Sequence, residues 1–158
     1  MKKMMTLIAC LTLSAFVINA VPTLTTAAEE EGPKLVCPVA NKPVNMEQAV
    51  EYKGAKVYFC CGGCVKKFKE DPAAFAVKAN HQLVASGQFK QVACPLSGGK
   101  LNPETKITLS DVGVCFCCNN CKGKVEGETD ATAQLGLVFS DAAFEKGFKK
   151  AKKEKSRD

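Results

Sequence analysis

The chain has 158 residues, of which 46% are hydrophobic and 24% are charged, and its formal net charge is +6. This composition is typical of a folded globular protein and excludes a disordered or largely membrane-embedded chain. Ten residues are cysteines and only one, His81, is a histidine, so a hydrolytic metal centre built on several histidines is excluded. We expect His81 to be solvated or at the edge of a core.

The N-terminus has the order of a secretory signal peptide. Two lysines precede an apolar run over residues 4–21, and small residues follow as far as Ala28. The sequence therefore predicts a cleaved signal peptide over residues 1–28 and a periplasmic or secreted protein. An uncleaved N-terminal anchor is the alternative. Cys10 lies inside this segment, so cleavage leaves nine cysteines.

An internal repeat organises the rest of the chain. Four cysteines recur with a single offset of 57 residues. The pairs are Cys37 with Cys94, Cys60 with Cys117, Cys61 with Cys118, and Cys64 with Cys121. Each copy reads Cys-Pro, then twenty-one further residues, then Cys-Cys-x-x-Cys. We therefore predict two tandem modules, over residues 33–88 and 90–158.

The ninth cysteine, Cys115, lies outside this pattern, opposite Tyr58 of the first module. We interpret it as a small buried apolar residue on a strand over residues 112–116. An auxiliary metal ligand and an intermolecular disulfide are the alternatives.

The first module is predicted to be a small α+β unit. After the Cys-Pro turn, residues 51–59 predict a β-hairpin around Lys53-Gly54. Residues 61–64 form a tight knuckle that opens a helix. Asp71-Pro72 then provides a helix cap with proline in the first turn, and the helix is expected to run to about Ser86 and to stop at Gly87.

The second module follows the same order but departs after its cysteines. We interpret residues 122–130 as an inserted linker and expect the next helix to begin at Ala142, after a cap at Ser140-Asp141. The basic segment 146–157 is predicted to be the solvated end of this C-terminal helix, where lysines complement the helix dipole. Each module alone is too small for a large core, so a metal or disulfides are expected to stabilise it.

Clustered cysteine thiolates at these spacings are typical of a metal site. Four of them suit tetrahedral zinc, whereas three favour Cu(I) or another soft metal. Adjacent cysteines on an extended backbone point to opposite sides, so the sequence does not decide whether the sulfurs of Cys60 and Cys61 both bind the same ion. The predicted ligands, for one Zn(II) or Cu(I) ion per module, are Cys37, Cys60, Cys61 and Cys64, and Cys94, Cys117, Cys118 and Cys121.

The motifs of the first module resemble the YHS domain and the related TRASH domain. The residues that carry the resemblance are Cys37-Pro38-Val39, Tyr52-Lys53-Gly54, Val57-Tyr58-Phe59-Cys60, Cys64, Phe68 and Asp71-Pro72. The resemblance implies small treble-clef-like modules that bind heavy metals through cysteines placed like Cys37, Cys60 and Cys64. The second copy would use Cys94, Cys117 and Cys121. It departs from the pattern where Leu109, Asp111 and Val125 replace the Tyr, Gly and Phe.

Two other functions stay open at this stage. The eight cysteines of the modules, in an oxidising compartment, also fit a disulfide-stapled interaction module, and the two Cys-x-x-Cys motifs fit a thiol–disulfide oxidoreductase. We favour an exported, non-enzymatic metal-binding protein that buffers or senses the ion or uses zinc to fold. Export excludes nucleic acid as a partner and makes an unidentified envelope protein a candidate partner.

Overall fold

The structure is a computed structural model that describes residues 34–152. The predicted signal peptide lies outside the described residues. Between residues 34 and 152, no helix combines the length and the apolar character needed to cross a membrane.

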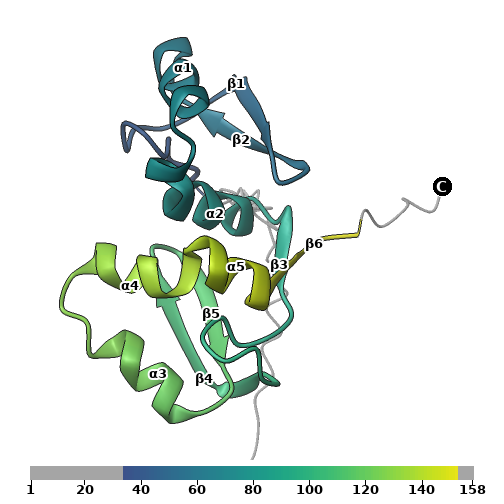
Figure 1. The fold of residues 1–158 in the computed structure, drawn as a ribbon, viewed down its shortest axis with the longest axis vertical. Coiled ribbons are helices and arrows are strands. Elements are labelled where there is room, and N and C mark those ends of the chain that lie inside the picture. The colour runs from purple at the N-terminus through teal and green to yellow at the C-terminus, as the bar shows by residue number, and fades with distance from the viewer. Residues whose placement is uncertain (1–33, 153–158) are drawn as a thin grey trace, which may run out of the picture. The chain divides into compact units, whose positions relative to one another are not determined.

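The described chain is a small α+β structure, as predicted, and it repeats one order of elements (Figure 1). Each half has a two-stranded hairpin followed by helices, and a third pair of short strands is formed by the segment after the first half and the end of the second. In the first half the elements are β1 (Asn45–Tyr52), β2 (Ala55–Phe59), α1 (Gly62–Glu70), the 3-10 helix η1 (Ala73–Phe75) and α2 (Ala76–Ala85). The later elements are β3 (Phe89–Gln91), β4 (Asn102–Leu109), β5 (Val112–Phe116), α3 (Asn119–Glu126), α4 (Ala131–Phe139), α5 (Asp141–Gly147) and β6 (Phe148–Lys150).

The two hairpins are the same structure displaced by 57 residues. Tyr52 pairs with Ala55 in the first, and Leu109 pairs with Val112 in the second. Both two-residue turns have positive φ angles, at Lys53 and Gly54 (51° and 73°) and at Ser110 and Asp111 (45° and 68°). Such turns match the right-handed twist of the strands. The turn is therefore kept even where the second copy lacks the glycine.

The helices after the first hairpin follow the prediction closely. α1 begins directly after Cys61, and the Asp71 side chain accepts a hydrogen bond from the Ala74 backbone N–H at 3.1 Å. The segment that Asp71 caps starts as the 3-10 helix η1 and continues as α2. α2 ends at Ala85, and Ser86 is its C-cap before Gly87, whose φ of 72° suits glycine.

The helices after the second hairpin correct the prediction of an inserted linker. α3 runs to Glu126, and the next helix, α4, begins at Ala131 rather than at Ala142. Asp130 caps α4 by accepting hydrogen bonds from the backbone N–H groups of Thr132 and Ala133. The helix predicted after Ser140 is present as α5, but it is an additional element of this half.

The prediction of a basic C-terminal helix is wrong for residues 148–150, and its residues after 152 lie outside the described part of the chain. After Gly147 the chain turns into β6, which pairs antiparallel with β3, with Phe148 opposite Gln91. A β-carbon at Gly147 would lie only 2.9 Å from Pro95 Cα, so the chain passes close to the turn of the second module. Phe148 is buried whereas Lys149 and Lys150 are exposed. The segment is a strand because β3 provides an antiparallel partner for its backbone.

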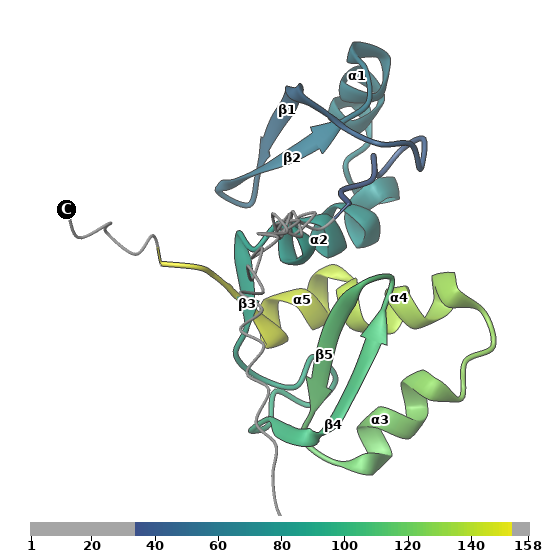
Figure 2. The same ribbon diagram turned by 180° about the vertical axis from the view of Figure 1, so that it is seen from behind.

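The two modules share one hydrophobic core. Figures 1 and 2 show α2 between the first hairpin and the helices α4 and α5 of the second module. Phe139 of α4 is fully buried, and its ring meets His81 of α2 edge-on at 5.1 Å and Phe148 at 5.5 Å. The ring nitrogen Nε2 of His81 lies 3.0 Å from the Ser110 carbonyl oxygen in the second hairpin turn. His81 is thus a core-edge residue, as predicted, and burial lowers its pKa.

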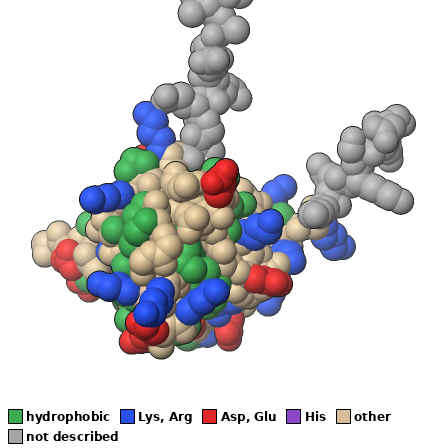
Figure 3. Space-filling view, turned by 90° about the horizontal axis from the view of Figure 1, so that it is seen from above, with side chains coloured by type: hydrophobic (Ala, Val, Ile, Leu, Met, Phe, Trp, Pro, Cys, Tyr) green, Lys and Arg blue, Asp and Glu red, His purple; other side chains and the backbone are tan. Residues whose placement is uncertain are grey.

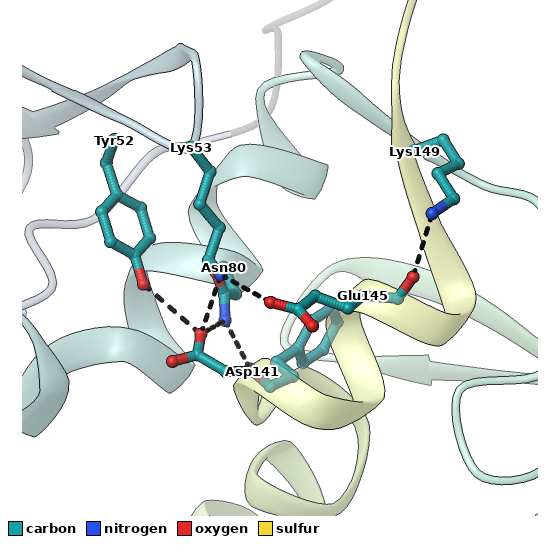
Figure 4. Close-up of polar contacts among 7 residues, drawn as sticks. Tyr52, Lys53, Asn80, Asp141, Glu145 and Lys149 are labelled. Carbon is teal, nitrogen blue, oxygen red and sulfur yellow. Dashed lines mark hydrogen bonds and ion pairs between the residues drawn. The ribbon is translucent and has the colours of Figure 1, made fainter.

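A polar cluster joins the first hairpin turn to α5 (Figure 4). Asp141 is its centre and accepts from the Asn80 Nδ2 group at 2.9 Å and from the Tyr52 hydroxyl at 3.4 Å. The Lys53 ammonium lies 3.2 Å from Asp141 and 3.7 Å from Glu145. Burial and the neighbouring Asp141 carboxylate raise the pKa of Tyr52 to about 12. Each hairpin turn therefore contacts a helix of the other module.

Candidate metal centres

The first cysteine of each module lies in a turn that aims backbone N–H groups at its sulfur. In the first module the Cys37 N–H donates to Lys42 O at 2.8 Å, and the Asn41 N–H donates to Cys37 O at 2.9 Å. Cys37 is 1% exposed, and burial by itself raises its pKa. Hydrogen bonds from the N–H groups of Cys60, Ala40 and Val39 outweigh burial, so the pKa of Cys37 is lowered.

The other cysteines come from the knuckle between the second strand of the hairpin and the following helix. Cys60 follows β2 directly, Cys61 is the extended residue that precedes α1, and Cys64 lies in the first turn of α1. The N–H groups of Cys64 and Val65 donate to Cys61 O at 3.1 and 3.2 Å. This turn points Cys64 back towards Cys60, and their sulfurs are 3.6 Å apart.

Three sulfurs converge in each module. The sulfurs of Cys37, Cys60 and Cys64 all lie within 4.8 Å of one another, and so do those of Cys94, Cys117 and Cys121. We call these sets the inner trios. A metal ion bound at about 2.3 Å to each sulfur needs sulfurs about 3.8–4.0 Å apart, in tetrahedral or trigonal geometry. The Cys60–Cys64 and Cys117–Cys121 distances of 3.6 and 3.7 Å fit that requirement.

The remaining predicted ligands, Cys61 and Cys118, lie beside the inner trios but outside them. Cys61 Sγ is 3.9 Å from Cys60 Sγ and 3.7 Å from Cys64 Sγ. Cys118 Sγ is 3.6 Å from Cys117 Sγ. Both side chains are exposed, whereas Cys37 and Cys94 are buried. The structure thus separates three converging sulfurs per module from a fourth at the surface.

Cys115 takes no part in either trio. It lies on β5 as predicted, but it is only partly buried, because Val114 and Phe116 on either side of it fill the core face of the strand. All nine cysteines among residues 34–152 are free thiols. Their shortest sulfur–sulfur distances, 3.6 Å, are far longer than a disulfide bond of about 2.05 Å.

The two centres differ in a hydroxyl group beside the thiols. Ser97 of the second module stands where the first has Ala40. Its hydroxyl lies 3.2 Å from Cys117 Sγ and is hydrogen-bonded to Cys94 as well. Burial raises the pKa of Cys94, but the Ser97 hydroxyl and backbone N–H groups outweigh it and lower the pKa to about 7. A hydroxyl that donates to thiolates stabilises their charge, so Ser97 distinguishes the second centre from the first.

The last cysteine of each knuckle has a raised pKa, in contrast to Cys37 and Cys94. Burial and the neighbouring thiols Cys60, Cys61 and Cys37 raise the pKa of Cys64 to about 12. Burial and the corresponding thiols of the second module raise the pKa of Cys121 to about 12. A bound cation would remove these protons, because metal ligation requires the thiolate.

A glutamine side chain holds each centre together, and sequence analysis missed both. In the first module Gln82 of α2 accepts from the Tyr58 N–H at 2.7 Å and donates to the carbonyls of Tyr58 and Val36, each at 2.8 Å. Tyr58 lies two residues before Cys60, and Val36 directly precedes Cys37. Gln82 is 2% exposed, so it joins the two cysteine-bearing segments in a buried position.

The second module has the same three contacts from a different element. Gln91 of β3 accepts from the Cys115 N–H at 2.8 Å and donates to the carbonyls of Cys115 and Ala93. Cys115 and Ala93 are the counterparts of Tyr58 and Val36 at the offset of 57, but Gln91 is not the counterpart of Gln82. The internal repeat does not relate these two glutamines, because they are nine positions apart in the sequence and not 57.

Lysine side chains surround the knuckle helices. Lys66, Lys67 and Lys69 on α1 are exposed, and on α3 Lys122 forms an ion pair with Glu126 at 3.6 Å. Figure 3 views the molecule from above and shows basic side chains interspersed with fewer acidic ones and with apolar patches. This positive surface attracts anionic groups, although salt screens the attraction.

The fold and these centres define a small cysteine-rich α+β protein with two sites suited to a soft metal ion. The family model of the YHS domain matches residues 36–79, which include the whole first inner trio. The first module is therefore a YHS domain, and the second module shares its arrangement of cysteines without being covered by that match. Comparison with curated proteins and with solved structures gave no match.

Proposed function

We propose that this protein is an exported, non-enzymatic protein that binds one soft metal ion in each of two treble-clef-like modules. The convergence of three cysteine sulfurs at equivalent positions of both modules carries the proposal. Three thiolates without a histidine or carboxylate among them suit Cu(I) better than Zn(II), which takes a fourth ligand. Export is inferred from the sequence of residues 1–28.

Binding would serve to buffer, sense or deliver the ion, or to stabilise the fold if the ion is zinc. The YHS match in the first module supports binding there, and the identical cysteine frame extends the proposal to the second. The only histidine is buried and contacts backbone carbonyls, so it offers no acid or base to either centre. This supports binding rather than catalysis.

Metal content and free thiols of the full-length protein, purified without oxygen, test the proposal. We expect two ions per chain and reduced cysteines. Cys37→Ser and Cys94→Ser should each remove one ion, whereas the control Cys115→Ser should remove none, since Cys115 lies outside both trios. A protein without metal, with its cysteines paired in disulfides, would refute the proposal and favour a stapled interaction module.

One observation favours a second candidate function, thiol–disulfide exchange. Cys61 is exposed, its sulfur lies 3.7 Å from Cys64 Sγ, and backbone N–H groups of Cys64 and Gly63 help to lower its pKa. An exposed thiolate at the start of a helix is typical of redox cysteines. Insulin reduction by the metal-free protein that is lost in Cys64→Ser would support this function; its absence in the wild type would exclude it.

A further inference from the structure

We propose that each module has a second, outer set of three sulfurs through which a soft metal ion enters and leaves the inner trio. This inference rests on the proposed metal binding. In the first module the outer trio is Cys60, Cys61 and Cys64, with sulfur–sulfur distances of 3.9, 3.6 and 3.7 Å. These distances match those required around a metal ion as well as the inner trio does.

The inner and outer trios share two of their three sulfurs. Cys60 and Cys64 belong to both, with Cys37 completing the inner trio and Cys61 the outer one. Cys61 is not among the sulfurs that lie within 4.8 Å of Cys37 and of one another. A tetrahedral site would need all four sulfurs about equally spaced, so Cys61 and Cys37 are placed as alternative third ligands.

The two alternative ligands differ sharply in exposure. Cys37 is a turn residue that is only 1% exposed, whereas Cys61 is exposed at the start of α1. The residues after Cys61 are Gly62 and Gly63, and a β-carbon on Gly63 would lie 3.8 Å from the Cys61 sulfur. Cys61 is therefore exposed beside two residues without side chains, where a donor or acceptor of metal can approach its sulfur.

The geometry provides a route for ligand exchange. An ion held by Cys60, Cys61 and Cys64 moves inward when its bond to Cys61 breaks and a bond to Cys37 forms. The bonds to Cys60 and Cys64 persist, the Cys37 thiol loses its proton, and the Cys61 thiolate gains one. No electron is transferred. Because two bonds are kept, the ion never leaves the protein during the step, and release follows the same steps in reverse.

In the second module, two of the three corresponding sulfur–sulfur distances are likewise short. Cys117 lies 3.6 Å from Cys118 and 3.7 Å from Cys121, and Cys118 is exposed as Cys61 is. Asn119 and Asn120 replace the two glycines. The outer sulfur is thus kept at both knuckles even though its neighbours changed.

Transfer of Cu(I) from the loaded full-length protein to a chromophoric Cu(I) chelator, followed by stopped flow without oxygen, tests the inference. We compare the wild type with the double variant Cys61→Ser, Cys118→Ser. The equilibrium affinity should change by less than about threefold, while the transfer rate should fall about tenfold or more. The matched control is Cys115→Ser, which also removes one partly exposed thiol but leaves both trios intact, and it should transfer like the wild type.

Two results would overturn the inference. A loss of affinity of about a hundredfold or more in the double variant would make Cys61 and Cys118 permanent ligands of four-sulfur sites. An unchanged transfer rate would show that the ion bypasses them. A failure of the proposed function is distinct, because the wild type itself would then take up no Cu(I) and the variants would have nothing to change.

Discussion

Replacing Gln82 with leucine should weaken both the fold and the first metal centre. The change leaves three backbone groups without their partner, namely the Tyr58 N–H and the carbonyls of Tyr58 and Val36. Each hydrogen bond contributes about 1 kcal/mol net, so the free energy of unfolding should fall by about 3 kcal/mol. Leucine fills a similar volume, so the loss is one of hydrogen bonding rather than of packing.

The same substitution should lower metal affinity at the first centre alone. Gln82 ties the segment before Cys37 to the strand before Cys60, so its loss lets the two sulfurs drift apart. Loss of such an indirect support typically costs about 10–100-fold in metal affinity. The ion of the second module, which Gln91 supports, should bind as before.

Urea unfolding of the metal-free protein, followed by circular dichroism, measures the first effect. Chelator competition in a Cys94→Ser background, where only the first centre is complete, measures the second. Gln88→Leu is the matched control. Gln88 also bonds β2, at the Lys56 N–H and carbonyl, but it is only partly buried and forms no hydrogen bond with the segment before Cys37. If Gln82→Leu lowers stability by less than about 1 kcal/mol and leaves the affinity unchanged, Gln82 does not position the centre.

Three further predictions concern the second centre and the shared core. Ser97→Ala should weaken metal binding at the second centre by about tenfold, measured by chelator competition, with Ala40→Ser as the reciprocal change in the first; equal affinities in both variants and the wild type would contradict it. Metal affinity at the second centre should rise with pH above 7, because the Cys121 thiol, with a pKa of about 12, must lose its proton on binding. Proton release measured by calorimetry checks this prediction, and a pH-independent affinity would refute it. Phe139→Ala should lower the free energy of unfolding by about 3–5 kcal/mol. Both modules should lose stability in a single unfolding transition, because Phe139 packs against elements of each. Two separate unfolding transitions in the wild type would show instead that the modules unfold independently.

Local features were predictable where the sequence itself carries the physical cause. The hairpin around Lys53-Gly54 follows from turn chemistry, and the helices after Cys61 and Asp71 follow from their caps. The offset of 57 predicted that both modules bring their cysteines together in the same way, and the inner trios confirm it. Asp130 caps α4 as Asp71 caps the helical segment of the first module, so the same local signal predicts α4 in place of a linker.

Features that depend on the partner of a segment were not predictable. Residues 148–150 have the lysine content of a solvated helix end, but the free edge of β3 makes them a strand. The supporting glutamines come from α2 in one module and from β3 in the other, because what matters is where an amide reaches the strand in space. Tertiary contacts override local preference at such positions.

The sequence by itself determined which cysteines belong together, because a repeated frame and a tight knuckle depend on neighbours along the chain. Only the tertiary structure decided how the four sulfurs of each module divide. Cys37 lies in a turn more than twenty residues before the knuckle and is buried, whereas Cys61 is exposed and lies outside the inner trio. That division depends on how the turn packs against the hairpin, and packing between distant segments is not encoded in the spacing of either one.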